Sequence, residues 1–516
     1  MRSSRAVPFL ALSAALGLTL ASCGFANGGD GSGGSTTSAG GGLTFSTLFA
    51  PSSNFAVESD DAVMLSQIGC LETLIRYDEV SGELKPLLAS EWSQTEPLAW
   101  DVTLRDDVTF QNGTRLTAET VATALNYVLG TDAPPRAFSP SVVSSVEVVD
   151  EDTVRVVTPE ESALLPYRLA SVNTGILAPE AYTDAGTDPM GTCTGPFAIT
   201  DYAPGQSLRL EPNTDYWGGD VPLDRVEVQF IPEGTARATQ IQTGEADIAG
   251  FLPATSIADV EADSEVTVTR TFTPRTTGLH FNTSRPPFDD PNVRRAVQAA
   301  LDLDSIAQNV FDGVAEPAIG PFAPEEPWAP NGAPVEQDLE LARELLAQAG
   351  YAPGELNVEL LGYTERPDFA DLAAVVQANL AEIGIGVTVN IAEYAAIEPA
   401  LLEGTYDMTL LSRNHLIDIA DPMGFLTSDY TCEGSFNVSH YCDPEFDAIL
   451  GAAGSESDPD ARYDLYAEAA QKLQDEAVTA FIVHEQSVTA VRNNVVGFVD
   501  DPLNRYAITA ELALED

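Results

Sequence analysis

The chain has 516 residues, of which 79 are acidic and only 24 are lysine or arginine, so its formal net charge at neutral pH is −55. This balance excludes nucleic acid as a favoured partner, because phosphate binding requires dense lysine and arginine. A cationic ligand is mildly favoured, while net charge carries no information about the fold. The length exceeds what one hydrophobic core usually supports, so we expect two or three domains.

The first 23 residues predict export from the cytoplasm. Residues 1–5 are short and cationic, and residues 6–21 are apolar. The apolar run is shorter than the roughly 20 residues of a comfortable membrane span, so residues 1–22 are predicted to be a signal peptide. Small Ala21 and Ser22 before Cys23 resemble the lipobox of bacterial lipoproteins, which implies acylation of Cys23 and stable anchoring outside the cytoplasm. The alternative is an ordinary secretory signal with an incidental cysteine.

A tether is predicted to follow the lipid anchor. Residues 23–42 are rich in glycine and serine and have almost nothing to bury, so we expect a flexible coil reaching roughly 25 Å. From Leu43 the composition becomes globular. Apolar residues then alternate over residues 98–104 and 226–230, which predicts half-buried strands. Between these strands, residues 117–130 have helical spacing, with Thr117 as the expected cap and Gly130 as the stop.

The second half of the chain alternates helical and strand patterns. Asp290-Pro291 predicts a helix start, and the segment from Asp338 to Gly350 repeats that design. Residues 372–383 form an apolar stripe that stops at Gly384, and alternation follows directly over residues 387–391. With the apolar run 408–411, this order predicts α/β layering over a largely parallel sheet.

Cysteine usage suggests two disulfides. If Cys23 carries lipid, four cysteines remain, an even number in an oxidising compartment, and four cysteines permit three pairings. Cys432 with Cys442 closes a short loop and leaves Cys70 with Cys193. A zinc site is the alternative, but the spacing lacks any CxxC. The histidines, whose spacing also fits no metal motif, are His280, His415, His440 and His484. We expect neither a bound metal nor a cofactor.

Seven short segments, taken in order, resemble the solute-binding proteins of peptide and nickel ABC importers, called family 5. Each segment is weak alone, whereas the ordered set spans almost the whole mature chain and is highly specific. The segments are LLASEW (87–92), WDVTLRDDVTF with Asn112-Gly113 (100–113), LTAETV (116–121), GPF (195–197), NTDYWGG (213–219), QTGEAD (242–247) and VRRAV leading to Leu301-Asp302 (293–302).

The resemblance implies an α/β fold of the periplasmic-binding-protein type, with two lobes around a cleft and an extra inserted domain. In this layout the first lobe comprises residues 43–82, 195–274 and 492–516. Residues 83–194 are the inserted domain, and residues 275–491 are the second lobe. Cys70 and Cys193 then both lie near the first lobe and its boundary, which supports their pairing.

The loop 412–422 is the expected ligand-binding segment, because ligands of open α/β sheets bind at the carboxyl ends of strands. In the peptide-binding branch, an aspartate four residues before the proline of such a loop binds the ligand's ammonium, and Asp418 has that spacing from Pro422. The alternative for Asp418 is a turn or capping carboxylate. Asp421, directly before Pro422, is expected to cap a helix.

Two further residues are weaker candidates for the site. Arg413 is expected either to meet a ligand carboxylate with its planar guanidinium or to pair with an acidic neighbour. Asn282 is expected to hydrogen-bond either the ligand or the backbone of the hinge. The disulfide-closed loop from Cys432 to Cys442 resembles that of dipeptide-type receptors and favours peptides over nickel.

The predicted function is therefore a monomeric, lipid-anchored receptor that captures a short peptide and delivers it to an ABC permease at the membrane. A chelated nickel ion, an opine or another amino compound is the alternative cargo. A secreted enzyme is the rival class, but GxSxG, HExxH and glycine-rich phosphate motifs are absent, and no catalytic residue is expected. A receptor that signals without transport is the third alternative.

Overall fold

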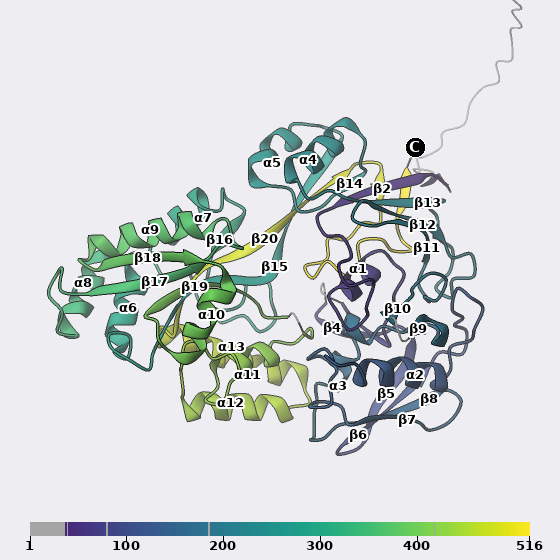
Figure 1. Cartoon of the computed structure of the whole chain (residues 1–516), viewed down its shortest axis with the longest axis horizontal. Coiled ribbons are helices and arrows are strands. Elements are labelled where there is room, and N and C mark those ends of the chain that lie inside the picture. The colour runs from purple at the N-terminus through teal and green to yellow at the C-terminus, as the bar shows by residue number, and fades with distance from the viewer. Residues whose placement is uncertain (1–36, 39, 79–80, 184–185, 417, 516) are drawn as a thin grey trace, which may run out of the picture. The chain divides into compact units, whose positions relative to one another are not determined.

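The computed structural model describes residues 37–38, 40–78, 81–183, 186–416 and 418–515 (Figure 1). The predicted signal peptide and Cys23 lie outside these residues. The described residues belong to one compact unit, 37–516. None of the helices in the described ranges is long and apolar enough to cross a membrane.

A mixed sheet of eleven strands is the centre of this unit, and its strands come from distant parts of the chain (Figure 1). Ten strands follow one another across the sheet, and β16 (Ala315–Pro317) pairs with β20. In spatial order the ten are β11 (Phe197–Ala203), β12 (Ser207–Pro212), β13 (Arg225–Phe230), β2 (Gly42–Thr47), β14 (Ile248–Ala249), β20 (Thr479–Arg492), β15 (Val266–Phe281), β19 (Met408–Asn414), β17 (Asn357–Tyr363) and β18 (Gly386–Ala392).

The antiparallel strands β15 and β20, of 16 and 14 residues, connect the two ends of this sheet. The first half of β15 pairs with the last residues of β20, next to β14, and its second half pairs with β19. The register of β15 against β20 shifts between Phe272 and Thr276. The lobe boundaries predicted near residues 274 and 491 fall in these two neighbouring strands, and the register shift of β15 spans residue 274.

Helix boundaries in the described chain follow the capping signals read from the sequence. Thr117 caps α2 (Ala118–Leu129), and its hydroxyl accepts from the Thr120 amide in a reciprocal capping box. Asp290 caps α6 (Pro291–Ala300), and Asp338 caps α8 (Leu339–Gln348). The stripe before Gly384 forms α9 (Phe369–Glu382), and Gly384 has a φ of +84°, which favours glycine. These predicted helices are confirmed.

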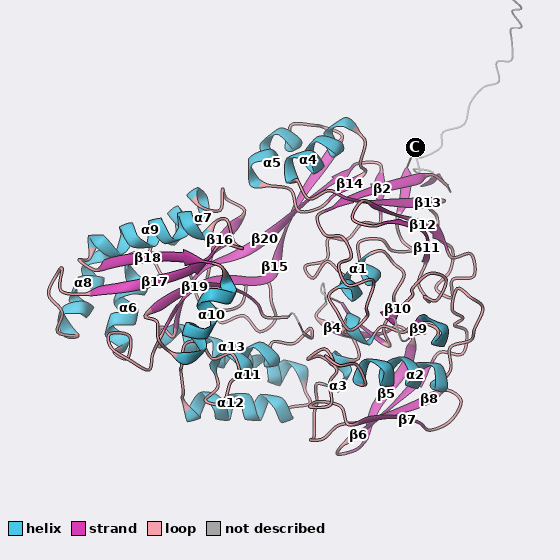
Figure 2. Cartoon of the chain, in the orientation of Figure 1, coloured by secondary structure: helices cyan, strands magenta, loops and turns pink. Residues whose placement is uncertain are grey.

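The predicted parallel pairing is found at the β18 edge of the main sheet, and β2 in the other half is also parallel to both β13 and β14. Strand β17 pairs in parallel with both β18 and β19, whereas β19 is antiparallel to β15. Figure 2 shows helices beside the β17–β19 strands. A separate four-stranded antiparallel sheet lies within residues 89–157, in the order β5 (Ala89–Glu96), β6 (Ala99–Leu104), β8 (Thr153–Val157) and β7 (Ser145–Val148).

The remaining elements are short or pack on these sheets. The helices are α1 (Asp61–Gln67), α3 (Leu165–Arg168), α4 (Gly234–Thr243), α5 (Ala254–Glu261), α7 (Leu303–Asn309), α10 (Tyr394–Glu403), α11 (Met423–Tyr430), α12 (Pro444–Ser455) and α13 (Pro459–Asp475). The strands are β1 (Thr37–Ser38), β3 (Ile75–Asp78), β4 (Glu83–Pro86), β9 (Tyr182–Thr183), β10 (Gly186–Thr187), β21 (Val495–Val496) and β22 (Ala513–Glu515).

The structured body begins earlier than the sequence pattern predicts. Strand β1 pairs with β22, and β2 starts at Gly42, so the end of the expected 23–42 tether carries regular structure. The physical reason is backbone pairing. A strand edge near the end of the chain supplies hydrogen-bond partners to Thr37 and Ser38 whatever their side chains.

Two disulfides are present, Cys70–Cys193 and Cys432–Cys442, with Cα–Cα distances of 5.4 Å and 4.3 Å. The first links residues 123 positions apart and lies in the core, where both cysteines have no exposed surface. The second closes a loop over 10 positions between α11 and α12. Both are the pairs expected from the sequence.

Candidate ligand-binding site

Three strand ends meet at one cavity of about 550 Å³, which we call the central cavity. Strands β2 and β14 are parallel neighbours, and the residues that follow them, Phe49 and Phe251, line it. Asn414, the last residue of β19, lines it from the other end of the sheet. Its volume falls within the roughly 300–1,000 Å³ typical of small-molecule sites, and the carboxyl ends of strands are where such sites form.

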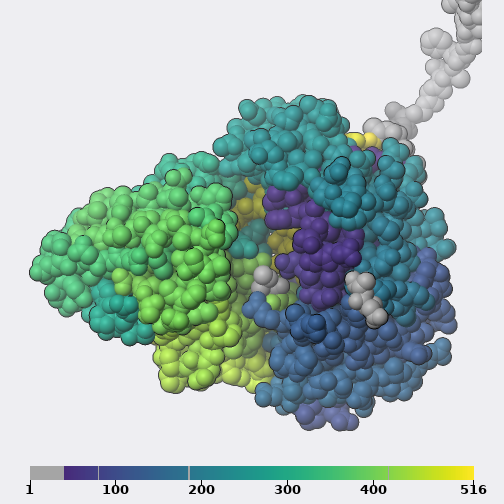
Figure 3. All heavy atoms as spheres, viewed as in Figure 1, coloured from purple at the N-terminus to yellow at the C-terminus, as the bar shows by residue number. Residues whose placement is uncertain are grey.

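Segments of both crossing strands line the same cavity. Residues 273–275 of β15 and 485–487 of β20 face it, so the register irregularity lies beside it. In Figure 3 the surface is hollowed between the purple residues near the start of the described chain and the green residues of the second half. A ligand in this cavity would therefore contact both halves of the sheet. Such contacts are needed for two parts of a protein to close around a ligand.

Two smaller cavities adjoin the central cavity. One of about 400 Å³, the side cavity, shares Thr273, Pro274 and Leu503 with it. The other, of about 110 Å³, shares Asp60 and Asn414 with it and is also lined by Asp418, so we call it the Asp418 cavity. Together they extend the cleft on either side of the strand ends.

Glu485 is the centre of a polar network on the floor of the central cavity. Its carboxylate accepts hydrogen bonds from Ser412 at 2.6 Å and from Thr277 at 2.7 Å, and it pairs with Arg366 at 3.1 Å. Arg366 is also paired with Asp368 at 3.1 Å. The charges of Arg366 and Glu485 are therefore already matched within the protein.

Arg275 differs from its neighbour Arg366 because no carboxylate of the described chain lies within 4 Å of its guanidinium. It donates at 3.3 Å to the hydroxyl and carbonyl oxygens of Ser412. Burial lowers the pKa of Arg275, and the more distant Glu485 partly opposes this effect. A half-buried, always-charged guanidinium facing a cavity is suited to bind a carboxylate of a ligand.

Asp60 brings a negative charge to the same cavity. It precedes α1, is exposed, and lines both the central and the Asp418 cavities. Within the described ranges its carboxylate has no hydrogen-bond or ion-pair partner. Arg275 and Asp60 were not singled out from the sequence, since nothing in their local pattern separates them from other charged residues. Only the pairing of β15 with β19 and the packing of α1 bring them to one cavity.

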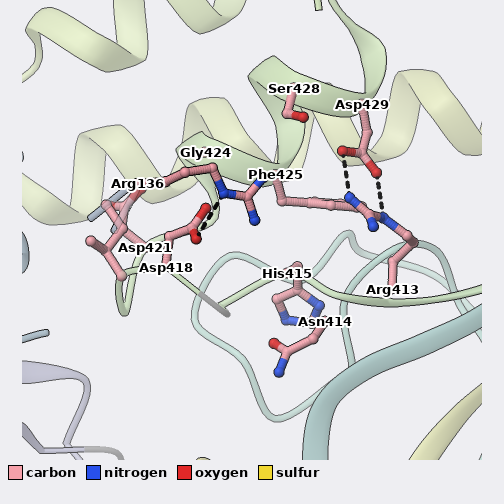
Figure 4. A pocket seen from close by; sticks show the side chains of 11 residues that line it. Arg136, Arg413, Asn414, His415, Asp418, Asp421, Gly424, Phe425, Ser428 and Asp429 are labelled. Carbon is pink, nitrogen blue, oxygen red and sulfur yellow. Dashed lines mark hydrogen bonds and ion pairs between the residues drawn. The ribbon is translucent and has the colours of Figure 1, made fainter. Parts of the chain in front are cut away.

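Asp418 lies in the expected loop, but its charge is matched by Arg136, which is in the part of the chain expected to be inserted. Nε of Arg136 is 3.1 Å from Oδ1 of Asp418, with side chains 62% and 27% exposed (Figure 4). Both residues line a small recess beside the cleft, and Asp418 also lines the cavity named after it. An ammonium at Asp418 must compete with an arginine that is largely in solvent.

Arg413 has an acidic neighbour, one of the two roles expected for it. Its Nε and Nη2 donate to the Asp429 carboxylate at 2.6 Å and 2.9 Å (Figure 4). Its guanidinium also lies 4.2 Å from the Phe436 ring centre. Burial raises the pKa of Asp429, and Arg413 opposes that rise. Because this planar fork is already filled by Asp429, Arg275 is the better placed group for a ligand carboxylate.

Asn282 is fully buried and hydrogen-bonds the protein itself. Its amide nitrogen donates to the carbonyls of Gly404 and Tyr406, each at 2.9 Å, and its oxygen accepts from Ser284. Of the two roles expected for Asn282, contact with backbone is the one observed, and it ties the end of β15 to the segment before β19.

Asp421 does not occupy the cap position expected for it, because α11 begins one residue later and Pro422 is its cap residue. One oxygen of Asp421 accepts from the Met423 amide at 2.9 Å. The carboxylate also pairs with Arg462 at 3.3 Å and accepts from Tyr466 at 2.8 Å, with both ionic side chains almost fully buried. Arg462 and Tyr466 belong to α13, about forty residues further along the chain, so the local pattern around Asp421 does not predict these contacts.

His415 and His440 each hydrogen-bond a different protein group. Nε2 of His415 is hydrogen-bonded to Glu326, and Nε2 of His440 is 2.9 Å from the carbonyl oxygen of Leu401. Within the described part of the chain, no group of three or more histidine, cysteine or acidic side chains is arranged to hold a metal ion.

The chain is similar to known solute-binding proteins. Residues 83–437 match the family model described as bacterial extracellular solute-binding proteins, family 5 middle. The chain is 28% identical over 465 residues to di/tripeptide-binding protein 2 of Pseudomonas aeruginosa, covering 82% of this chain and 85% of that protein. It is 25% identical over 451 residues to a nickel-binding protein of Staphylococcus aureus, covering 87% and 90%. A crystal structure of a nickel ABC transporter from Bacillus halodurans matches with a TM-score of 0.82 at 29% identity, covering 92% and 100%.

Proposed function

Because the chain belongs to family 5 of the bacterial extracellular solute-binding proteins, we propose that it captures a short peptide in the cleft and delivers it to an ABC permease at the membrane. The observation that carries the peptide proposal is the charge pattern of the central cavity. Arg275 and Asp60 both face this one cavity. Among the residues that the structure describes, neither has an oppositely charged partner within 4 Å. A short peptide carries a carboxylate and an ammonium, which complement these two groups.

Asp418 remains the proposed partner of the peptide ammonium, as the resemblance implies, with Asp60 beside it in the Asp418 cavity. In the structure the exposed guanidinium of Arg136 is paired with Asp418. Exposed ion pairs contribute only about 0–1 kcal/mol, so displacing Arg136 costs little. When the cleft closes around a peptide and excludes water, the attraction between the peptide ammonium and Asp418 exceeds that of the exposed Arg136–Asp418 pair. The reason is that charge pairs strengthen as the surroundings lose water.

The place of action in this proposal is the outer face of the cell membrane. A signal peptide over residues 1–22 and acylated Cys23 would hold the protein there by lipid. Treatment of host membranes with a lipoprotein lipase, or mass spectrometry of the mature amino terminus, tests the anchor. A mature protein that is released from the membrane and begins at a residue other than Cys23 contradicts the lipid anchor.

Isothermal titration shows which solute the protein binds. Di- and tripeptides are titrated first, and nickel with histidine as its chelator is titrated separately. We expect binding of at least one peptide and recovery of that peptide unchanged. Binding of the nickel complex alone favours the second candidate, which rests on the nickel-binding relatives. Hydrolysed peptide contradicts the binding role and favours a secreted enzyme.

A further inference from the structure

Phe251 has an unusual backbone conformation at the edge of the central cavity. Its φ is +54°, in the left-handed region that L-residues with a bulky side chain rarely adopt. Directly after it, Leu252 is 5% exposed, and its amide donates to the Val488 carbonyl at 2.9 Å. The strained residue thus lies where the chain leaves β14 and re-enters the core, and its side chain lines the cavity.

A buried arginine holds this conformation. Arg237 of α4 is 3% exposed, and its Nε donates to the Gly250 carbonyl at 2.9 Å. Its Nη2 donates to the carbonyl of Phe251 itself, and its Nη1 donates to Ile231 at 2.5 Å. Backbone strain persists only where surrounding contacts over-determine it, and it gathers at sites that bind ligands.

The ring of Phe251 has an aromatic partner on the neighbouring strand end. Phe49 follows β2, is 60% exposed, and meets Phe251 edge to face with ring centres 5.6 Å apart at 79°. Ala50, Val63, Met64, Pro274 and Leu503 continue the apolar wall of the cavity around this pair. Arg275 and Asp60 line the same cavity, so it presents an apolar wall together with one cationic and one anionic group that lack an ionic partner among the described residues.

We propose that Phe49 and Phe251 form an apolar subsite that selects solutes with a large aromatic or aliphatic side chain. The subsite rests on the proposed function, because it assigns the side chain of a peptide whose charged ends are held by Arg275 and by Asp60 or Asp418. Phe49, left mostly exposed without ligand, loses its contact with water when that side chain enters. Burial of apolar surface is then the source of selectivity.

The test compares matched dipeptides that differ in one side chain, Ala-Phe, Ala-Leu and Ala-Ser, by isothermal titration with four proteins. These are the wild type, Phe49→Ala, Phe251→Gly and the control Leu98→Ala, which removes a 42% exposed apolar side chain outside the cavities described. Glycine at position 251 removes the ring and accepts the positive φ, so that variant is expected to fold. A thermal melt of each protein checks folding.

We expect the wild type and Leu98→Ala to bind Ala-Phe or Ala-Leu at least tenfold more tightly than Ala-Ser. Phe49→Ala and Phe251→Gly are expected to reduce that preference to less than threefold. Peptides bound without preference by the wild type, or an unchanged preference in the folded Phe49→Ala protein, overturn the subsite and leave the proposed function standing. If the wild type binds no peptide at all, the proposed function fails and the subsite with it.

Discussion

Arg136 and Asp418 are 282 residues apart in the chain, and their side chains form an ion pair with a 3.1 Å separation beside the cleft. This contact joins the segment before β7 to the loop after β19, and both residues line the same small recess. It offers a direct comparison between two variants that break the same pair.

Asp418→Ala is expected to lower peptide affinity at least tenfold with a nearly unchanged melting temperature, because its ion-pair partner Arg136 is 62% exposed and such pairs contribute little to stability. Arg136→Ala breaks the same pair and is the matched control. It is expected to keep the wild-type affinity or increase it, since the competing cation is gone. Titration calorimetry and thermal melts of both variants show whether Asp418 binds the ligand or stabilises the fold. A loss of stability in Asp418→Ala that parallels the loss of affinity identifies a structural carboxylate instead.

Arg275→Gln is expected to remove recognition of the peptide carboxylate. Wild-type protein should bind a free peptide at least tenfold more tightly than its C-terminally amidated form, because only the free form pairs with the guanidinium. The variant should bind both forms equally. Arg343→Gln is the charge-matched control, since Arg343 donates to the Glu382 carbonyl on the protein surface and is expected to leave the discrimination intact. Equal binding of both forms by the wild type refutes this role.

His484 predicts a loss of stability in acid. Its two ring nitrogens are 2.9 Å from the Thr276 hydroxyl and 3.1 Å from the Ile319 amide, which donates to Nε2, so the neutral ring fits this site. Burial lowers the pKa of His484 to about 3. In the unfolded chain the pKa of this histidine is about 6.5. At a pH below that value the unfolded chain binds a proton at His484 and the native state does not, so the free energy of unfolding falls as pH decreases.

The His484→Gln variant isolates this contribution from those of other groups. The stability advantage of the wild type over the variant should shrink by about 2 kcal/mol between pH 7 and pH 5, because each pH unit below 6.5 is worth about 1.4 kcal/mol. Urea unfolding at a series of pH values measures it. A difference between the two proteins that stays constant with pH shows that His484 is not kept neutral by burial.

The two disulfides are expected to contribute unequally to stability. In the chain-entropy model a loop of 123 positions is worth about 5 kcal/mol and one of 10 positions about 3 kcal/mol. The Cys70→Ser/Cys193→Ser double variant should therefore lose more stability in denaturant than Cys432→Ser/Cys442→Ser. Non-reducing peptide mapping should recover both pairs from the oxidised protein. Equal losses contradict the ranking, and free thiols contradict the pairing.

Local sequence signals determined much of this fold. The caps Thr117, Asp290 and Asp338 and the stop at Gly384 predict helix ends correctly because a cap is satisfied within one helical turn. The family resemblance and the α/β two-lobe class are likewise confirmed, since ordered motifs over most of the chain specify a fold more tightly than any one of them does.

Tertiary structure alone decided which charged groups face the cleft. The sequence singles out Asp418 and Arg413 as candidates, but their partners Arg136 and Asp429 are set by packing and not by local pattern. Arg275 and Phe251 carry no local mark of function. They meet in one cavity only because β2, β14, β15 and β19 are neighbours in a sheet assembled from distant segments, and periodicity along a strand does not specify its neighbours.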